Sequence, residues 1–149
     1  MLIPKPLPFA ILLIGSLFCR AIHAGPNDVP RLGTFIYSDI CASPQSGDVY
    51  GTRITLRRLA DGDMLIYEYT DGSTHALVAE ELALDPKSGS VQFAVPNPDG
   101  GTAHMTGQFL HAGRALTLKT PLFGDPKRTY TLVRIDNPGA AVRDCKMKP

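Results

Sequence analysis

The chain has 149 residues, with 15 Lys or Arg against 14 Asp or Glu, so its formal net charge at neutral pH is +1. This balance excludes the strongly basic surface that nucleic acids and anionic membranes select. The length fits a single domain with a sizeable core.

The first 24 residues have the pattern of a secretory signal peptide. Lys5 precedes a largely apolar run, Phe9–Phe18, and the segment ends in Ala24, a small residue suited to a cleavage site. The run is shorter than the roughly 20 residues that a membrane span needs, although an uncleaved anchor is the alternative. We expect export to the periplasm or medium, and a mature domain of residues 25–149 with no stable membrane insertion.

The mature chain keeps two of the three cysteines. Cys19 lies in the signal segment, and Phe18 before it does not fit the small residue of a lipoprotein signal. Cys41 and Cys145 remain, and an even pair in an exported chain predicts a disulfide. Their spacing gives no support for a catalytic or metal-binding thiol pair.

Short strand-like runs separated by glycine turns follow one another from Val49 to Ile135. The clearest lies at 49–59, where Ile54 and Leu56 alternate with charged residues. Gly107 indicates a bulge or a bend within its strand. In chain order we expect strands at residues 32–38, 49–59, 64–70, 81–84, 90–95, 102–110, 114–120 and 128–135.

The stretch Thr74–Asp85 is ambiguous. Its Ala, Leu and Glu content favours a helix. However, residues 85–89 have the composition of a hairpin loop, and residues 90–95 read as a strand that residues 81–84 would pair with. We expect an extended crossing followed by a strand, with a short helix as the alternative.

The elements predict an all-β fold, an antiparallel meander of about eight strands that closes into a small barrel with one disulfide. The strand and turn pattern resembles the calycin-like barrels, which include lipocalins, avidins and periplasmic lysozyme inhibitors. Gly33-Thr34-Phe35 is the nearest match to the lipocalin Gly-x-Trp opening, and the chain has no Trp. A barrel of about eight strands has an interior that is filled by side chains or holds one small ligand.

No constellation of residues in the sequence indicates catalysis or metal binding. His75, His104 and His111 have no metal-ligand spacing, and Asp61-Gly62-Asp63 lacks the later ligands of a calcium loop. The serine-nucleophile motif Gly-x-Ser-x-Gly is absent. We therefore expect a protein that is not an enzyme and that uses no cofactor.

We expect an exported binding protein of unknown target, most simply a protein-binding module of the inhibitor or immunity type in the cell envelope. The loop Asp39–Asp48 on a stapled scaffold suits that role. The alternative is a carrier that holds a small ligand in the barrel interior. Tyr and Arg are enriched at binding hot spots, although these residues are also ordinary in barrels. The candidate binding residues are Tyr67, Tyr69, Tyr130, Arg57 and Arg134.

Overall fold

The computed structural model describes residues 29–119, 122, 127–137 and 142–146, and the predicted signal segment with Cys19 lies outside them. All the regular structure within these residues is β-strand, which confirms the all-β prediction. No helix long and apolar enough to cross a membrane occurs in this part of the chain. The strands are β1 (Gly33–Ser38), β2 (Cys41–Ala42), β3 (Val49–Arg58), β4 (Asp63–Asp71), β5 (Thr74–Val78), β6 (Glu81–Asp85), β7 (Ser90–Pro96), β8 (Thr102–Leu110), β9 (Ala115–Lys119), β10 (Tyr130–Ile135) and β11 (Arg143–Asp144).

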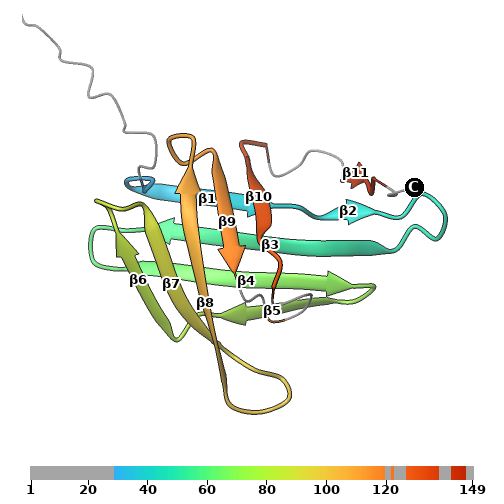
Figure 1. Ribbon diagram of the computed structural model, residues 1–149, viewed down its shortest axis with the longest axis horizontal. Helices are drawn as coiled ribbons and strands as arrows, with labels where there is room; N and C mark the ends of the chain where they lie inside the picture. The colour runs from blue at the N-terminus through green and yellow to red at the C-terminus, as the bar shows by residue number, and fades with distance from the viewer. Residues whose placement is uncertain (1–28, 120–121, 123–126, 138–141, 147–149) are drawn as a thin grey trace, which may run out of the picture.

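Most strands pair with their neighbours in the sequence, as a meander requires. Antiparallel ladders join β3 to β4, β4 to β5, and then each strand from β6 to β10 to the next. β1 lies between β3 and β10, with Ile36 opposite Thr55 on one side and Ile135 on the other. This pairing of the first strand with the last long one curls the sheet into a half-barrel (Figure 1).

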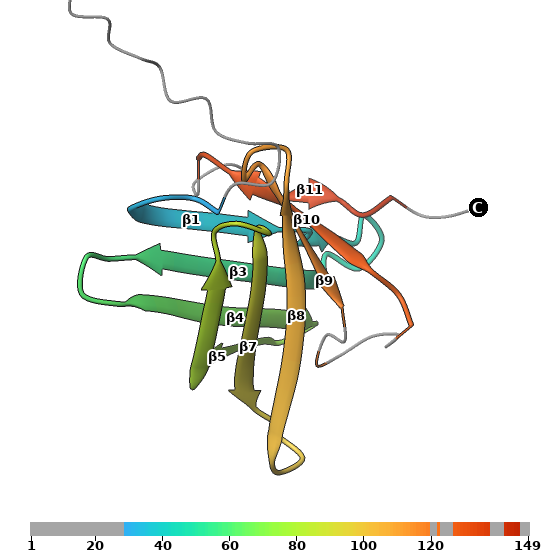
Figure 2. The ribbon, with the colours of Figure 1, turned by 60° about the vertical axis from the view of Figure 1, so that its left-hand side comes forward.

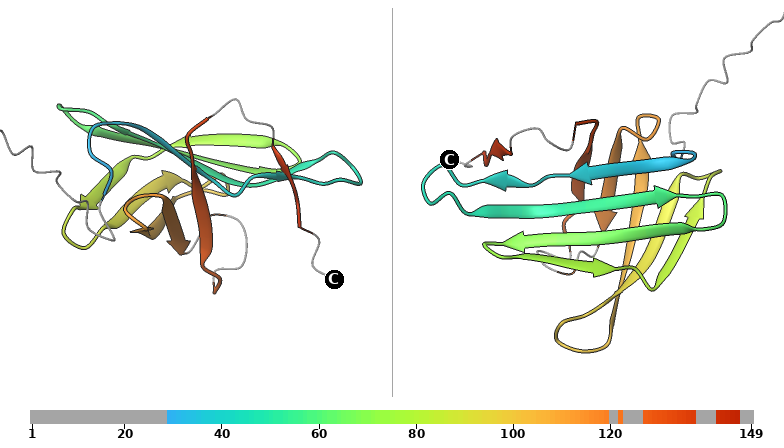
Figure 3. Two further views of the ribbon diagram at one scale, coloured as in Figure 1. Left: turned by 90° about the horizontal axis from the view of Figure 1, so that it is seen from above. Right: turned by 180° about the vertical axis from the view of Figure 1, so that it is seen from behind.

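The curled sheet forms two layers whose strands cross. β1, β3, β4 and β5 lie roughly along one axis, and β6, β7, β8 and β9 run steeply across it (Figures 1 and 2). The view from above shows the two layers separated by the interior (Figure 3, left). Strands that cross in this way are typical of orthogonal β-packing, in which the inner faces of both layers supply the core.

The ambiguous segment 74–85 is extended, as we expected, and contains the bend between the layers. The Ala79 amide donates to the Leu65 carbonyl of β4 at 2.9 Å, whereas the next amide, that of Glu80, donates to the Ala94 carbonyl of β7 at 2.9 Å. β5 therefore pairs with one layer and β6 with the other. The helical propensity of this segment is overridden because both layers offer it backbone hydrogen bonds.

Apolar side chains from both layers fill the interior. The rings of Tyr37 and Phe109 lie 5.7 Å apart, and those of Tyr67 and Phe93 lie 6.2 Å apart. The fully buried residues also include Ile54, Leu56, Leu65, Met105, Leu116, Leu118, Leu132, Val91 and Val95.

Gly107 allows the inner side of β8 to approach β9 closely. The register runs through Gly107 without a break, with Val91 on one side and Leu118 on the other, so the residue makes no bulge. A Cβ at this position would lie 2.5 Å from the Thr117 carbonyl oxygen, which excludes every larger residue unless the backbone shifts.

The predicted disulfide between Cys41 and Cys145 is present, with a Cα–Cα distance of 4.8 Å. It joins β2 to the segment that follows β11, and these two short strands pair in parallel. The Cys145 amide also donates to the Ala42 carbonyl at 2.8 Å. The bond therefore attaches the C-terminal segment to the first third of the chain.

Candidate binding surfaces

Two of the predicted binding residues, Tyr67 and Tyr69, lie in the interior. Tyr67 is fully buried, and its hydroxyl makes no hydrogen bond of regular geometry. Burial raises the pKa of Tyr67, while the nearby Thr52 hydroxyl and Leu122 backbone oppose that shift. The Tyr69 ring stacks on the His75 imidazole with their centroids 4.8 Å apart.

The other three predicted residues lie at separate places. Arg57 is exposed on the outer face of β3. The Arg134 guanidinium lies 5.0 Å from the Phe35 ring centroid and forms an ion pair with Asp136 at 3.0 Å. Tyr130 is half-buried, with the Arg128 guanidinium 5.6 Å from its ring centroid. The five residues therefore do not form one site, and their binding roles stay predictions.

A row of mostly apolar side chains crosses the outer face of the layer that holds β1, β3, β4 and β5. Register places Val78 of β5 opposite Ile66 of β4, Ile66 opposite Thr55, Thr55 opposite Ile36 of β1, and Ile36 opposite Ile135 of β10. Directly opposed residues share a face of the sheet, so this row is continuous over five strands. We call the row, together with the outward-facing Met64 and Val133, the apolar face.

The apolar face is open to solvent at both ends. Val78 is 56% exposed and Val133 is 49% exposed, although the residues between them are half-buried. Leu32 and Leu59, which are also exposed, lie at the end of this layer where Gly33 pairs with Arg58. Exposed apolar residues are unremarkable singly, but a contiguous set of them marks an interaction surface.

Arginines border the apolar face on both sides. Arg53 donates two hydrogen bonds to the Glu68 carboxylate, at 2.7 and 2.6 Å, and this bonding raises the pKa of Arg53. Arg57, four residues further along β3, lies opposite Met64. An apolar centre with Met and Arg is the composition in which protein interfaces differ from other surfaces.

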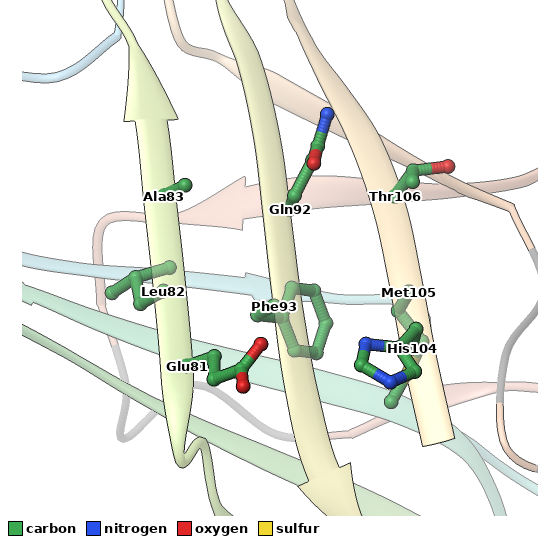
Figure 4. Close-up of a pocket in the computed structure, with 8 residues that line it drawn as sticks. All are labelled: Glu81, Leu82, Ala83, Gln92, Phe93, His104, Met105 and Thr106. Carbon is green, nitrogen blue, oxygen red and sulfur yellow. The ribbon is translucent and has the colours of Figure 1, made fainter. Parts of the chain in front are cut away.

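The outer face of the other layer has a polar recess of about 230 Å³ between β6, β7 and β8. Figure 4 shows the Glu81 carboxylate and the His104 imidazole turned toward one another in front of Phe93. Ala94, which register places between Glu81 and His104, is too small to fill the space. The full lining is Glu81, Leu82, Ala83, Gln92, Phe93, His104, Met105 and Thr106.

The recess offers several hydrogen-bonding side chains. It holds one carboxylate and one imidazole, with an amide and a hydroxyl beside them. No cluster of three or more His, Cys, Asp or Glu residues suited to a metal ion occurs among the described residues. The recess can therefore form hydrogen bonds with a polar or charged group.

A further recess, of about 270 Å³, lies beside the disulfide and is lined by Asp39, Cys41, Arg143, Asp144 and Lys146. The Asp39 carboxylate accepts a hydrogen bond from the Thr52 amide at 2.7 Å. Burial nevertheless raises the pKa of Asp39, and the Thr52 hydrogen bond and the arginines Arg143 and Arg128 offset only part of that effect. The Asp39 carboxylate therefore already has a hydrogen-bond partner within the fold.

The sequence shows that both sides of β4 are apolar, but its pattern does not show which side faces the core. Met64 and Ile66 alternate with Leu65 and Tyr67, so both sides of β4 are apolar and neither is marked as the inner one. Only the register with β1 and β5 shows that the second apolar side continues across neighbouring strands.

Comparisons with protein-family models, with curated proteins and with solved structures gave no match for this chain. The likeness to calycin-like barrels therefore stays a resemblance of strand and turn pattern. Any function must be argued from the surfaces of the protein itself.

Proposed function

We propose that this chain is an exported binding protein of the cell envelope that engages another protein through the apolar face. The observation that carries the proposal is the row from Val78 to Ile135 over five strands, in which Thr55 is the one polar member. Burying such a row against a partner gains hydrophobic free energy, at about 25 cal/mol per Å² of apolar surface. The arginines beside it supply contacts at the rim of the interface.

The filled interior favours a surface-binding role over the alternative of a small-ligand carrier. Fully buried side chains such as Tyr37, Tyr67 and Phe109 occupy the space between the two layers. A ligand in that space would have to displace close-packed side chains. An external partner needs no such rearrangement.

The disulfide supports the exported location that the signal segment predicts. Bonds of this kind persist in the periplasm and outside the cell and are rare in the cytosol. We therefore expect the partner to occupy the same compartment, as an inhibitor or immunity-type function would require.

Affinity capture from an envelope extract of the source cells tests the proposal. The immobilised wild-type chain should retain a defined protein partner, and Val78→Lys combined with Ile66→Lys should weaken that retention at least about tenfold, since both changes place a charge in an apolar contact. Thr102→Lys is the control, because it adds a charge at an exposed strand position on the other layer.

Retention that is equal for the wild-type chain and the Val78→Lys, Ile66→Lys variant would contradict the role of the apolar face. Failure to retain any partner, combined with binding of a small molecule that thermally stabilises the chain, would favour the carrier instead.

A further inference from the structure

β6 has one edge with no strand beside it. It pairs with β7 on one side and is the terminal strand of the pairing order, with no ladder on its other side in the part of the chain that the structure describes. Figure 1 and the right-hand view of Figure 3 show β6 at the margin of its layer. An unpaired edge of this kind presents backbone groups that a further strand can bind.

The backbone groups at this edge belong to Leu82 and Leu84. The Asp85 carbonyl accepts a hydrogen bond from the Gly89 amide within the β6–β7 hairpin, so the polar groups of Asp85 point toward β7. The backbone amide and carbonyl groups of successive residues in a strand point to opposite sides. Those of Leu82 and Leu84 therefore point away from β7, to the open side. Both side chains are half-buried against the core, and a further strand would cover them completely.

The charges on β6 disfavour pairing with a second copy of the chain. An antiparallel pair that used all five residues of β6 would centre on Ala83 and place Glu81 opposite Asp85 of the other copy. Like charges directly opposite one another destabilise a sheet. Residues 79–89 contain three acidic residues and one basic residue, Lys87, and Arg31 and Arg58 line a recess with Pro86 beyond the Asp85 end.

We propose that β6 accepts, by antiparallel strand addition, an extended segment of a partner protein that carries Lys or Arg at two positions four residues apart. The basic residues lie opposite Glu81 and Asp85, and small apolar residues between them cover Leu82 and Leu84. The Asp85 carboxylate accepts hydrogen bonds from the Lys87 amide at 2.9 Å and the Ser88 hydroxyl at 2.7 Å, which hold it at the strand end.

The recess beside β6 provides a place for the central residue of the added strand. That residue lies opposite Ala83, whose side chain is small and exposed and which lines the recess. A long side chain can therefore cross Ala83 and approach Gln92, which register places on the far side of Ala83 (Figure 4). A tyrosine suits this path because its ring is apolar and its hydroxyl can form a hydrogen bond with the Gln92 amide.

The test uses the labelled peptide acetyl-Ser-Lys-Val-Tyr-Val-Arg-Ser-amide and the disulfide-bonded chain. Fluorescence anisotropy should show saturable binding, weakened at least about tenfold when Glu replaces the Lys and Arg of the peptide. The Glu81→Lys, Asp85→Lys variant should reverse this preference. In the complex, the Leu82 and Leu84 amides should exchange with solvent more slowly.

Two N-methylated peptides separate strand addition from a general attraction between charges. The first peptide is methylated on the alternate amides that would face β6, and the second on the amides that would face away from it. Only the second peptide should bind, since its β6-facing amides remain free to donate hydrogen bonds. Equal binding of both, indifference to the Lys and Arg, or a dimer of the free chain that forms through β6 would overturn the proposal. The apolar face is not part of this test, so a negative result here leaves the proposed function standing.

Discussion

Tyr37 and Tyr67 are both fully buried, but only one of their hydroxyl groups has a hydrogen-bond partner. The Tyr37 hydroxyl donates to the Gly113 carbonyl at 2.8 Å, whereas the Tyr67 hydroxyl has no such bond. Burial raises the pKa of both residues, so both stay protonated at neutral pH. The two tyrosines are therefore comparable in burial and differ in whether the hydroxyl group has a hydrogen-bond partner.

Replacing each tyrosine by phenylalanine should separate these two cases. Tyr37→Phe should lower the free energy of unfolding by about 1–2 kcal/mol, since it removes a buried hydrogen bond. Tyr67→Phe should leave the free energy of unfolding unchanged or raise it by up to about 1 kcal/mol, since the lost hydroxyl had no regular partner. Urea denaturation of both variants measures the difference, and equal losses would contradict the assignment.

Asp39 should make the stability of the fold depend on pH. Because burial raises its pKa above the ordinary value of 3.8, the folded chain binds this proton more tightly than the unfolded chain does. The contribution of Asp39 to stability therefore falls as the pH rises from about 3.8 through the raised pKa of the folded state.

Asp39→Asn should remove this contribution while keeping an oxygen that can accept the Thr52 hydrogen bond. The difference in unfolding free energy between variant and wild type should then shift in favour of the variant as the pH rises through that range, as measured by urea denaturation at a series of pH values. A difference that shifts toward the wild type would mean that the carboxylate is stabilised by its charge.

At the scale of elements, the bend between β5 and β6 depends on two consecutive amides. Glu80→Pro removes the amide that donates to the Ala94 carbonyl at the bend. We expect a loss of about 1–3 kcal/mol in the free energy of unfolding, measured by urea denaturation. Glu80→Ala, which keeps the amide, is the control and should change stability by less than about 0.5 kcal/mol.

The strands were predictable because their pattern is local. Alternation within 49–59 and the glycine turns locate β3 and its neighbours, and the structure has these strands within a few residues of the expected bounds. The segment 74–85 was harder, since its propensity and its surroundings disagree. Gly107 could be marked as special, but the close approach of the Thr117 carbonyl that requires it depends on tertiary structure.

The apolar face was not predictable in the same way. It consists of residues from five strands, and each strand contributes only one or two of them. Its existence depends on register, which is set by the turns and by the choice of inner face. The predicted residues Tyr67 and Tyr69 illustrate this limit, because an apolar alternation on both sides of β4 does not reveal which side is buried.

At the scale of the whole molecule, the disulfide restricts the unfolded chain strongly. It links residues 104 positions apart. In the chain-entropy model, a loop of this size corresponds to about 4–5 kcal/mol of stabilisation. Replacing Cys41 and Cys145 together by alanine should lower the free energy of unfolding by up to that amount in urea denaturation. Reduction of the wild-type chain should give the same loss, and a loss below about 1 kcal/mol would contradict a structural role.

The most direct test of the binding role is a cross-saturation NMR measurement on the complex with the captured envelope partner. Saturation transferred from the partner should reduce the methyl signals of Ile36, Ile66 and Val78, which lie on the apolar face. The methyl signals of Val91 and Leu116, which are buried inside, should stay unchanged. Reduction of the interior signals, with those of the apolar face unaffected, would contradict a protein that binds its partner through this face.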